Sequence, residues 1–186
     1  MADLVRLSKF LALLLRHKAD EFGLTLDADG FTDVDSVWKQ INKRFPNRYN
    51  YKDLLAVVDG DADGKKRYEL TDGRIRALFG HSEGVREVTY APAAPPEILY
   101  HGTTRSTLPI IREQGLRAMR RQYVHFAVNT LRAGKVAARH GDTPVLLRVR
   151  AGDAHRAGVV FYHPEEEHYL ADELPPEFIE FPEDTV

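Results

Sequence analysis

The sequence predicts an α+β protein made of two lobes. Up to Val58 the apolar residues recur at helical spacing, and from Lys66 the pattern changes to the alternation of a strand pair. Beyond position 97, strand-like and helix-like segments alternate. Residues 90–96 between these regions are mostly proline and alanine, the composition of a semi-rigid linker. We therefore expect one lobe over residues 1–90 and a second over residues 97–186.

The N-terminal lobe is expected to begin with three helices. The first should end near Lys18, and its leucines form one apolar stripe: Leu4, Leu7, Leu11, Leu14 and Leu15. Asp33 and Asn50 can each cap a further helix, because their short side chains accept the free N–H groups of a first turn. The apolar residues of those two helices are Val37, Trp38 and Ile41, and Leu54, Leu55 and Val58.

A strand pair is expected to close this lobe. Lys66–Leu70 and Arg74–Leu78 have strand character, and Asp72-Gly73 is a favourable tight turn between them. Three helices closed by a hairpin predict a winged helix. That module binds nucleic acid in many proteins and is purely architectural in others.

The C-terminal lobe is expected to mix strands and helices too irregularly for a doubly wound parallel sheet. The expected strands are Ile98–His101, Tyr123–Ala127, Val145–Val149 and Val159–Tyr162, and the expected helices are Ser106–Gln114 and Thr130–Arg139. The sequence contains no glycine-rich dinucleotide motif and no P-loop motif.

The composition excludes several classes of protein. The chain of 186 residues is 43% hydrophobic and has no cysteine, which rules out disulfides, a thiolate zinc site and a cysteine nucleophile. No apolar run is long enough to span a membrane. We therefore expect a cytoplasmic protein without a membrane partner, and no obligate protein partner is evident from the sequence.

The net charge of −2 hides an asymmetry along the chain. Every lysine and arginine lies at or before Arg156, whereas the segment from Tyr162 to Val186 holds nine of the 28 acidic residues. The rest of the chain carries 26 basic against 19 acidic residues, an excess that favours a phosphate-rich ligand on one face. The acidic segment itself is best explained as a solvated stretch.

Two histidines in the C-terminal lobe are candidates for chemistry. His101-Gly102-Thr103 ends a predicted strand, where glycine lets a ligand approach the backbone and the polar side chains can hydrogen-bond ribose or amide groups. Taken alone, this tripeptide is more often a structural turn, and His125 in the next strand is more often a core histidine. Paired His-x-Thr motifs of a phosphoesterase are another reading, but His125-Phe126-Ala127 lacks the hydroxyl. No two of the eight histidines have the i, i+4 spacing of a helical zinc motif, so we expect no metal.

Basic residues at three places could hold an anion, and each place has an ordinary alternative. Arg16-His17 falls in the last turn of the first helix, where cations complement the helix dipole. Arg74 and Arg76 share one face of the hairpin, and Arg120-Arg121 precedes a strand. Exposed arginines are common in both settings.

The joint occurrence of these motifs is more specific than any one of them. The motifs, in order, are Leu15-Arg16-His17, Arg74-Ile75-Arg76-Ala77, Gly80-His81-Ser82, Tyr100-His101-Gly102-Thr103, Gly115-Leu116, Met119-Arg120-Arg121-Gln122-Tyr123-Val124-His125-Phe126 and Arg139-His140-Gly141. Their order and spacing resemble the tRNA 2′-phosphotransferase family from about Leu7 to Phe178.

The resemblance implies a fold and a site. It implies an N-terminal winged-helix lobe that binds the RNA 2′-phosphate, and a C-terminal ADP-ribosyltransferase-like lobe with a split sheet that binds NAD⁺. The family's catalytic Arg-His-Arg-Arg set would correspond to Arg16, His17, Arg76 and Arg121. The NAD⁺ site would be lined by His101, Gly102, Thr103 and His125, with help from Arg139.

The implied reaction transfers an internal RNA 2′-phosphate, as at tRNA splice junctions, to the co-substrate NAD⁺ through an ADP-ribosylated RNA. Its products are 2′-hydroxyl RNA, ADP-ribose 1″,2″-cyclic phosphate and nicotinamide, and no metal is needed. Arginine forks suit a phosphate that no metal holds, and His17 can help to move a proton. The alternatives are an ADP-ribosyltransferase that stops after the first step, on a nucleic-acid phosphate or a protein, and a non-catalytic winged-helix RNA-binding module.

The sequence departs from the family's pattern at three points. Leu78-Phe79 stands where members often have a polar pair, and Tyr123 stands where they often have a second histidine. The third departure is the segment Phe161–Leu170. Members usually have Phe-Tyr-x-Ser-x-Asn-x-Val-Trp-Leu there, whereas this chain has Phe-Tyr-His-Pro-Glu-Glu-Glu-His-Tyr-Leu.

Overall fold

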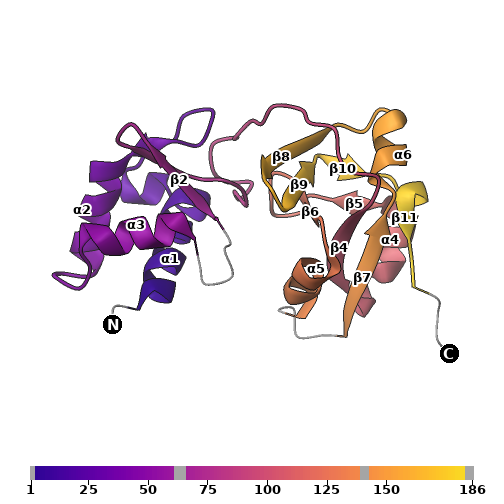
Figure 1. The fold of residues 1–186 in the computed structure, drawn as a ribbon, viewed down its shortest axis with the longest axis horizontal. Coiled ribbons are helices and arrows are strands. Elements are labelled where there is room, and N and C mark those ends of the chain that lie inside the picture. The colour runs from indigo at the N-terminus through magenta and orange to yellow at the C-terminus, as the bar shows by residue number, and fades with distance from the viewer. Residues whose placement is uncertain (1–2, 61–65, 139–142, 183–186) are drawn as a thin grey trace. The chain divides into compact units, whose positions relative to one another are not determined.

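The computed structural model describes residues 3–60, 66–138 and 143–182. The chain forms two compact units (Figure 1). The first comprises Met1–Thr89 with Arg120–Gln122, and the second comprises Tyr90–Met119 with Tyr123–Val186. Both units combine helices with antiparallel strands, which confirms the predicted α+β class. Within the described ranges, no helix is long and apolar enough to cross a membrane.

The helices of the first unit begin where the sequence predicts. Its elements are α1 (Leu4–Ala12), η1 (Leu13–His17), η2 (Asp20–Phe22), α2 (Val34–Arg44) and α3 (Tyr51–Asp59). Asp33 accepts a hydrogen bond from the backbone N–H of Ser36 at the start of α2. Asn50 and Asp53 form a capping box at the start of α3. Both predicted caps are confirmed.

The first helix differs from the prediction in its last turn. It ends at His17, close to the expected Lys18, but η1 is a π-helix rather than an α-helix. The N–H of Lys18 donates to the carbonyl of Leu13, five residues back, at 2.9 Å. Such wide turns often occur at functional positions. This one carries Arg16 and His17.

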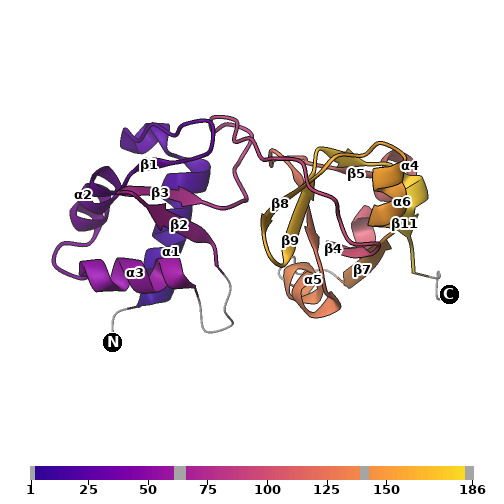
Figure 2. The same ribbon diagram turned by 45° about the horizontal axis from the view of Figure 1, so that its top comes forward.

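The predicted hairpin is confirmed and belongs to a larger sheet (Figure 2). Strands β2 (Tyr68–Thr71) and β3 (Arg74–Ala77) pair antiparallel, and Asp72 and Gly73 have φ values of 48° and 72°, as a type I′ turn requires. A two-residue strand, β1 (Thr32–Asp33), pairs with the other edge of β3, so the order is β1-β3-β2. The sequence did not predict β1.

One apolar core joins the helices and the sheet of the first unit. Its fully buried members include Leu7, Leu11, Leu14, Leu15, Ile41, Leu54, Tyr68 and Ile75. The hydroxyl of Tyr68 donates to the carbonyl of Ser8 at 2.6 Å, so the buried oxygen is satisfied. The core also holds η1 against β3, and the segment that follows β3 is therefore close to Arg16 and His17.

The second unit is built on a six-stranded antiparallel sheet. Its order is β11-β7-β4-β6-β9-β8, with β4 (Leu99–Thr104), β6 (Val124–Ala127), β7 (Pro144–Val149), β8 (Phe161–Glu165), β9 (His168–Ala171) and β11 (Ile179–Glu180). The strands β5 (Leu116–Arg117) and β10 (Glu173–Leu174) form a separate pair. The helices are η3 (Arg105–Thr107), α4 (Leu108–Gln114), α5 (Thr130–Ala137), α6 (Ala151–Arg156) and η5 (Pro176–Phe178).

The four predicted strands and two predicted helices of this region are present with small shifts in their ends. The strand that begins near Leu99 runs on to Thr104, so His101-Gly102-Thr103 lies within β4 and not at its end. The predicted end of the second helix, Arg139, lies outside the described residues.

The two faces of this sheet have different partners. Side chains alternate between the faces of a strand, and Leu99, Leu147 and Phe126 point into a core shared with α4 and α6. The helix α5 packs on β4 and β7 at the other face. His125 alternates with Val124 and Phe126 of that core, so its side chain lies on the face that α5 covers in part.

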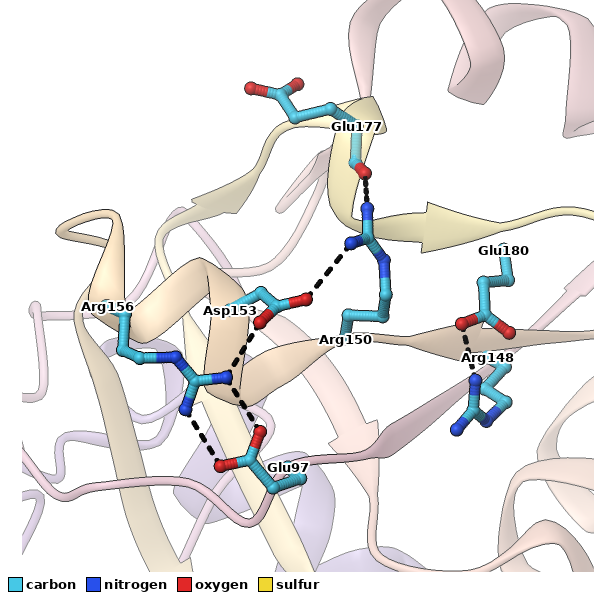
Figure 3. A network of polar contacts seen from close by, with 7 residues as sticks. All are labelled: Glu97, Arg148, Arg150, Asp153, Arg156, Glu177 and Glu180. Atoms are coloured by element: carbon cyan, nitrogen blue, oxygen red, sulfur yellow. Dashed lines mark hydrogen bonds and ion pairs between the residues drawn. The ribbon is translucent and has the colours of Figure 1, made fainter.

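A network of exposed ion pairs fastens α6 to the segment before β4 (Figure 3). Arg156 contacts both carboxylate oxygens of Glu97 at 2.8 and 2.9 Å, and also reaches Asp153 at 2.7 Å. Arg150 donates to Asp153 at 3.0 Å and to the carbonyl of Glu177. Exposed ion pairs stabilise little individually. The network therefore orients these segments more than it stabilises the fold.

Candidate active site

The predicted site residues fall into two groups, one in each unit. Arg16, His17, Arg76 and Arg121 belong to the first unit, because Arg120–Gln122 is part of it. His101, Gly102, Thr103 and His125 belong to the second unit. Arg139 lies outside the described residues.

Three residues of the first group converge on the segment Gly80–Ser82. The carbonyl of Arg16 accepts the N–H of Ser82 at 2.9 Å, and Nδ1 of His17 lies 2.7 Å from the Oγ of Ser82. Arg121 donates from Nη1 to the carbonyl of Gly80. The neighbouring residues Arg16 and His17 therefore come together with Arg121, which lies more than a hundred positions later in the sequence.

Gly80 makes room for this convergence. Its φ of +89° lies in a region that other residues rarely adopt. A Cβ at this position would lie 3.4 Å from Nη1 of Arg16 and 3.6 Å from Nη1 of Arg121. The two guanidinium groups thus flank the same α-carbon.

Gln122 holds the Arg120–Gln122 segment in place. Its side-chain amide donates to the carbonyls of Ser82, Val85 and Arg86 at 3.0 to 3.2 Å and accepts the N–H of Val88 at 3.0 Å. Its backbone N–H donates to the carbonyl of His81. One side chain therefore fixes the position from which Arg121 extends. Gln122 lies within one of the motifs of the sequence, but no local pattern indicates this role.

Arg76 is held on the neighbouring hairpin by other contacts. Its Nε donates to Glu69 at 2.7 Å, its Nη1 donates to the carbonyl of Asp29 at 3.1 Å, and its guanidinium lies over the ring of Phe31. Arg76 is nevertheless one of the cations that act on the buried His81. Its charge therefore reaches the cluster that Arg16, His17 and Arg121 form.

The cations of this cluster repel added protons. Burial, followed by the charges of Arg121 and Arg16, lowers the pKa of His17 below its usual value. His81 is 2% exposed, and burial together with Arg16, His17, Arg121 and Arg76 lowers its pKa to about 3. Burial also lowers the pKa of Arg121. Both histidines therefore favour the neutral form at neutral pH, and the arginines together favour an anion.

A hydrogen bond to the backbone determines which ring nitrogen of His101 carries a hydrogen. Nδ1 of His101 lies 2.9 Å from the carbonyl oxygen of His125. A carbonyl can only accept, so Nδ1 carries the hydrogen and the neutral ring keeps Nε2 as an acceptor. His101 can therefore accept a hydrogen bond from a hydroxyl group.

Gly102 and Thr103 have structural roles in the fold. A Cβ on Gly102 would overlap the backbone carbonyl of Ala133, so glycine at this position lets α5 lie directly on β4. The hydroxyl of Thr103 lies 2.7 Å from that of Thr107, and the residue is 9% exposed. The backbone of α5 thus occupies the space that we had expected glycine to give a ligand.

His125 has a partner that the sequence did not indicate. Its Nδ1 lies 2.7 Å from Nε2 of His168, and the ring centroids are 5.0 Å apart. Tyr123 packs edge-on against Tyr90 and Tyr162, with centroids 5.4 and 5.3 Å away, on the same face of the sheet. Across the described ranges, no group of three or more histidine and acidic side chains could hold a metal ion.

Comparison with known proteins identifies the family. Residues 2–173 match the family model described as RNA 2′-phosphotransferase, Tpt1 / KptA family. The chain is 37% identical to a probable RNA 2′-phosphotransferase of Acetivibrio thermocellus, over 97% of this chain and 98% of that protein. It is 41% identical to one of Pseudomonas aeruginosa, over 92% and 93%, and 40% identical to one of Rhodopirellula baltica, over 97% of each. The chain therefore belongs to the RNA 2′-phosphotransferase family.

Proposed function

We propose that the protein is an NAD⁺-dependent RNA 2′-phosphotransferase. It takes an internal 2′-phosphate from RNA, as at a tRNA splice junction, and transfers it to the ADP-ribose part of NAD⁺. The first unit serves as a winged-helix lobe that binds the 2′-phosphate, and the second serves as an ADP-ribosyltransferase-like lobe that binds NAD⁺.

The convergence of Arg16, His17 and Arg121 on Gly80–Ser82 is the observation that carries this proposal. A dianionic phosphate would relieve the repulsion between the guanidinium groups of Arg16 and Arg121, which match its oxygens in pairs. Arg76 adds a third guanidinium group from β3. The cluster thus fits a phosphate group better than a nucleobase, which is recognised through hydrogen bonds to its edge.

The reaction that we propose has two steps. The 2′-phosphate attacks the anomeric carbon of NAD⁺, nicotinamide leaves, and the RNA phosphate becomes a diester with ADP-ribose. The 2″-hydroxyl then attacks the phosphorus and the RNA 2′-oxygen leaves. The proton lost by the 2″-hydroxyl ends on the RNA 2′-oxygen, so the products are 2′-hydroxyl RNA and ADP-ribose 1″,2″-cyclic phosphate.

The lowered pKa of His17 suits the proton transfer of the second step. A neutral imidazole can accept the hydroxyl proton and return it to the leaving oxygen. The hydrogen bond between Nδ1 and Ser82 sets the direction of the ring, so Nε2 is the atom that we assign to this transfer. The arginines stabilise the charge that builds on the phosphate oxygens.

The residues of the second unit fit the ribose of NAD⁺. Nε2 of a neutral His101 can accept a hydrogen bond from a ribose hydroxyl, because its Nδ1–H is bound to the His125 carbonyl. We assign His125 to the NAD⁺ site as well, because of the resemblance to the family. Its ring lies on the opposite face of its strand from Phe126, whereas the His101 ring packs against Phe126. We assign Gly102 and Thr103 to the structural support of this NAD⁺ site.

The test is incubation of the full chain with NAD⁺ and a synthetic RNA that bears one internal 2′-phosphate. Release of nicotinamide together with ADP-ribose 1″,2″-cyclic phosphate supports the proposal. Nicotinamide release with stable ADP-ribosylated RNA identifies an ADP-ribosyltransferase that stops after the first step. RNA binding without NAD⁺ binding or turnover identifies a non-catalytic RNA-binding module. Either of the last two results overturns the proposal.

A further inference from the structure

His168 is a buried histidine that the proposed reaction does not use. It opens β9, is 9% exposed and lies opposite Ala127 of β6 in the sheet. His125 lies two residues before Ala127 on β6, so the two histidines are diagonal neighbours on one face.

The contact between the two histidines restricts both rings. Nε2 of His168 and Nδ1 of His125 are 2.7 Å apart, a distance at which one nitrogen must donate and the other accept. If both nitrogens carried hydrogens, the two N–H groups would face each other. The pair therefore keeps one hydrogen between the rings, and this choice fixes the form of Nε2 of His125 whenever that ring is neutral.

The strand that carries His168 is anchored independently of His125. Arg132 of α5 forms an ion pair with Glu165 at 3.1 Å, and both side chains are 11% exposed. Arg132 also contacts Glu167, and the carbonyl of Glu167 accepts the N–H of Val128 at 3.3 Å. Because α5 holds the β8–β9 turn in this way, the position of His168 does not depend on its contact with His125.

Other titratable groups lie near the two histidines, on the strands and the helix that pack against β6 and β9. Glu165 is the register partner of His168 on β8, and Arg132 on α5 offsets its charge. His101 on β4 holds the backbone carbonyl of His125. The tyrosines on the same face are Tyr123, Tyr162 and Tyr100, from the segment before β6, from β8 and from β4.

We propose that His168 is a positioning residue that orients the His125 ring and selects the nitrogen of His125 that carries the hydrogen. This inference rests on the proposed function, because it takes His125 to contact NAD⁺. His125 is then held at two points, its ring by His168 and its carbonyl by His101. His168 acts on NAD⁺ binding only through His125.

The experiment compares NAD⁺ affinity by calorimetry for full-length variants. His168→Leu removes the hydrogen bond at similar volume, and His168→Gln restores a polar group near the former Nε2. The matched control is His163→Leu. His163 is an exposed histidine of the same hairpin, and its ring stacks on that of Tyr169. We expect His168→Leu to weaken binding about three- to tenfold, the usual effect of one hydrogen bond, His168→Gln to recover much of the loss, and the control to stay near wild type.

A double-mutant cycle separates positioning from a general structural role. In the background of His125→Ala, the change His168→Leu should have no further effect on affinity, because its only route has been removed. A loss that persists in that background overturns the inference. Long-range ¹⁵N spectra of the unmodified protein provide a second readout that needs no variant. A single form of neutral His125 supports the inference, and rapid averaging of both forms overturns it.

The same variants distinguish a failure of the proposed NAD⁺ site from a failure of the role proposed for His168. If His125→Ala leaves NAD⁺ binding unchanged, the proposed NAD⁺ site is wrong. If His125→Ala weakens binding but His168→Leu does not, the proposed function stands and the role of His168 is wrong.

Discussion

The buried His81 makes the first unit sensitive to mild acid. In the folded protein its pKa is about 3, whereas in the unfolded chain it returns to the ordinary value of 6.5. Between these values the unfolded chain binds a proton that the folded chain does not, so the free energy of unfolding falls as the pH falls. The slope is about 1.4 kcal/mol per pH unit. His81 alone should therefore remove about 2 kcal/mol of stability at about pH 5.

His17 and four carboxylates with lowered pKa values act in the same direction as His81, the carboxylates at lower pH. The pKa of His17 is also lowered, so its effect has the same sign as that of His81. The shifted carboxylates Asp27, Asp33 and Asp153 have pKa values below the ordinary 3.8, and that of Glu97 lies below the ordinary 4.5. Their contributions to stability are present above these ordinary values and are lost as the pH falls through the lower folded values.

Urea unfolding followed by Trp38 fluorescence measures this effect. Trp38 is the single tryptophan and packs on the core of the first unit, so its signal reports the unit that contains His81. The free energy lost between about pH 7 and about pH 5 should be about 2 kcal/mol smaller in His81→Asn than in the wild type. The matched control is His163→Asn, at an exposed position. An equal loss in the wild type and in His81→Asn would refute the reasoning, whatever their stabilities at neutral pH.

Three further predictions concern the site and its support. Ser82→Ala removes only the hydroxyl beside His17. The unfolding free energy in urea should therefore change by less than about 1.5 kcal/mol, while turnover falls about tenfold. Unchanged turnover would show that the His17 ring does not need this hydrogen bond for its orientation. Gly102→Ala should destabilise the fold by about 1–3 kcal/mol because its Cβ meets the backbone of α5, whereas Gly84→Ala meets nothing; equal melting curves by circular dichroism would contradict this. Arg121→Ala should slow the second chemical step about 10²–10³-fold and let ADP-ribosylated RNA accumulate in a single-turnover gel assay; equal slowing of substrate loss and product gain without an intermediate band would count against the assigned role.

The features that the sequence predicted correctly depend on local chemistry. Asp33 and Asn50 cap helices because a short polar side chain satisfies N–H groups three residues away. Asp72-Gly73 forms the hairpin turn because both residues tolerate positive φ. Neither feature depends on residues that are distant in the sequence.

The features that were missed depend on distant partners or on very few residues. β1 has two residues and exists because β3 offers it an edge. The π-turn at Leu13–His17 keeps the apolar pattern of an α-helix, so periodicity could not reveal it. The contact of His168 with His125 arises from strand pairing across more than forty positions of sequence, and no local pattern marks it.

The membership of Arg120–Gln122 in the first unit has a consequence for synthesis of the chain. The polypeptide leaves that unit at Thr89 and supplies these three residues only after thirty others have been added. During translation, the helices and the hairpin can assemble as soon as they emerge from the ribosome. The Gly80–Ser82 backbone cannot receive Arg121 and Gln122 until β4, α4 and β5 have all been made. Until then, the nascent first unit therefore has its apolar core but lacks part of its cluster of cations.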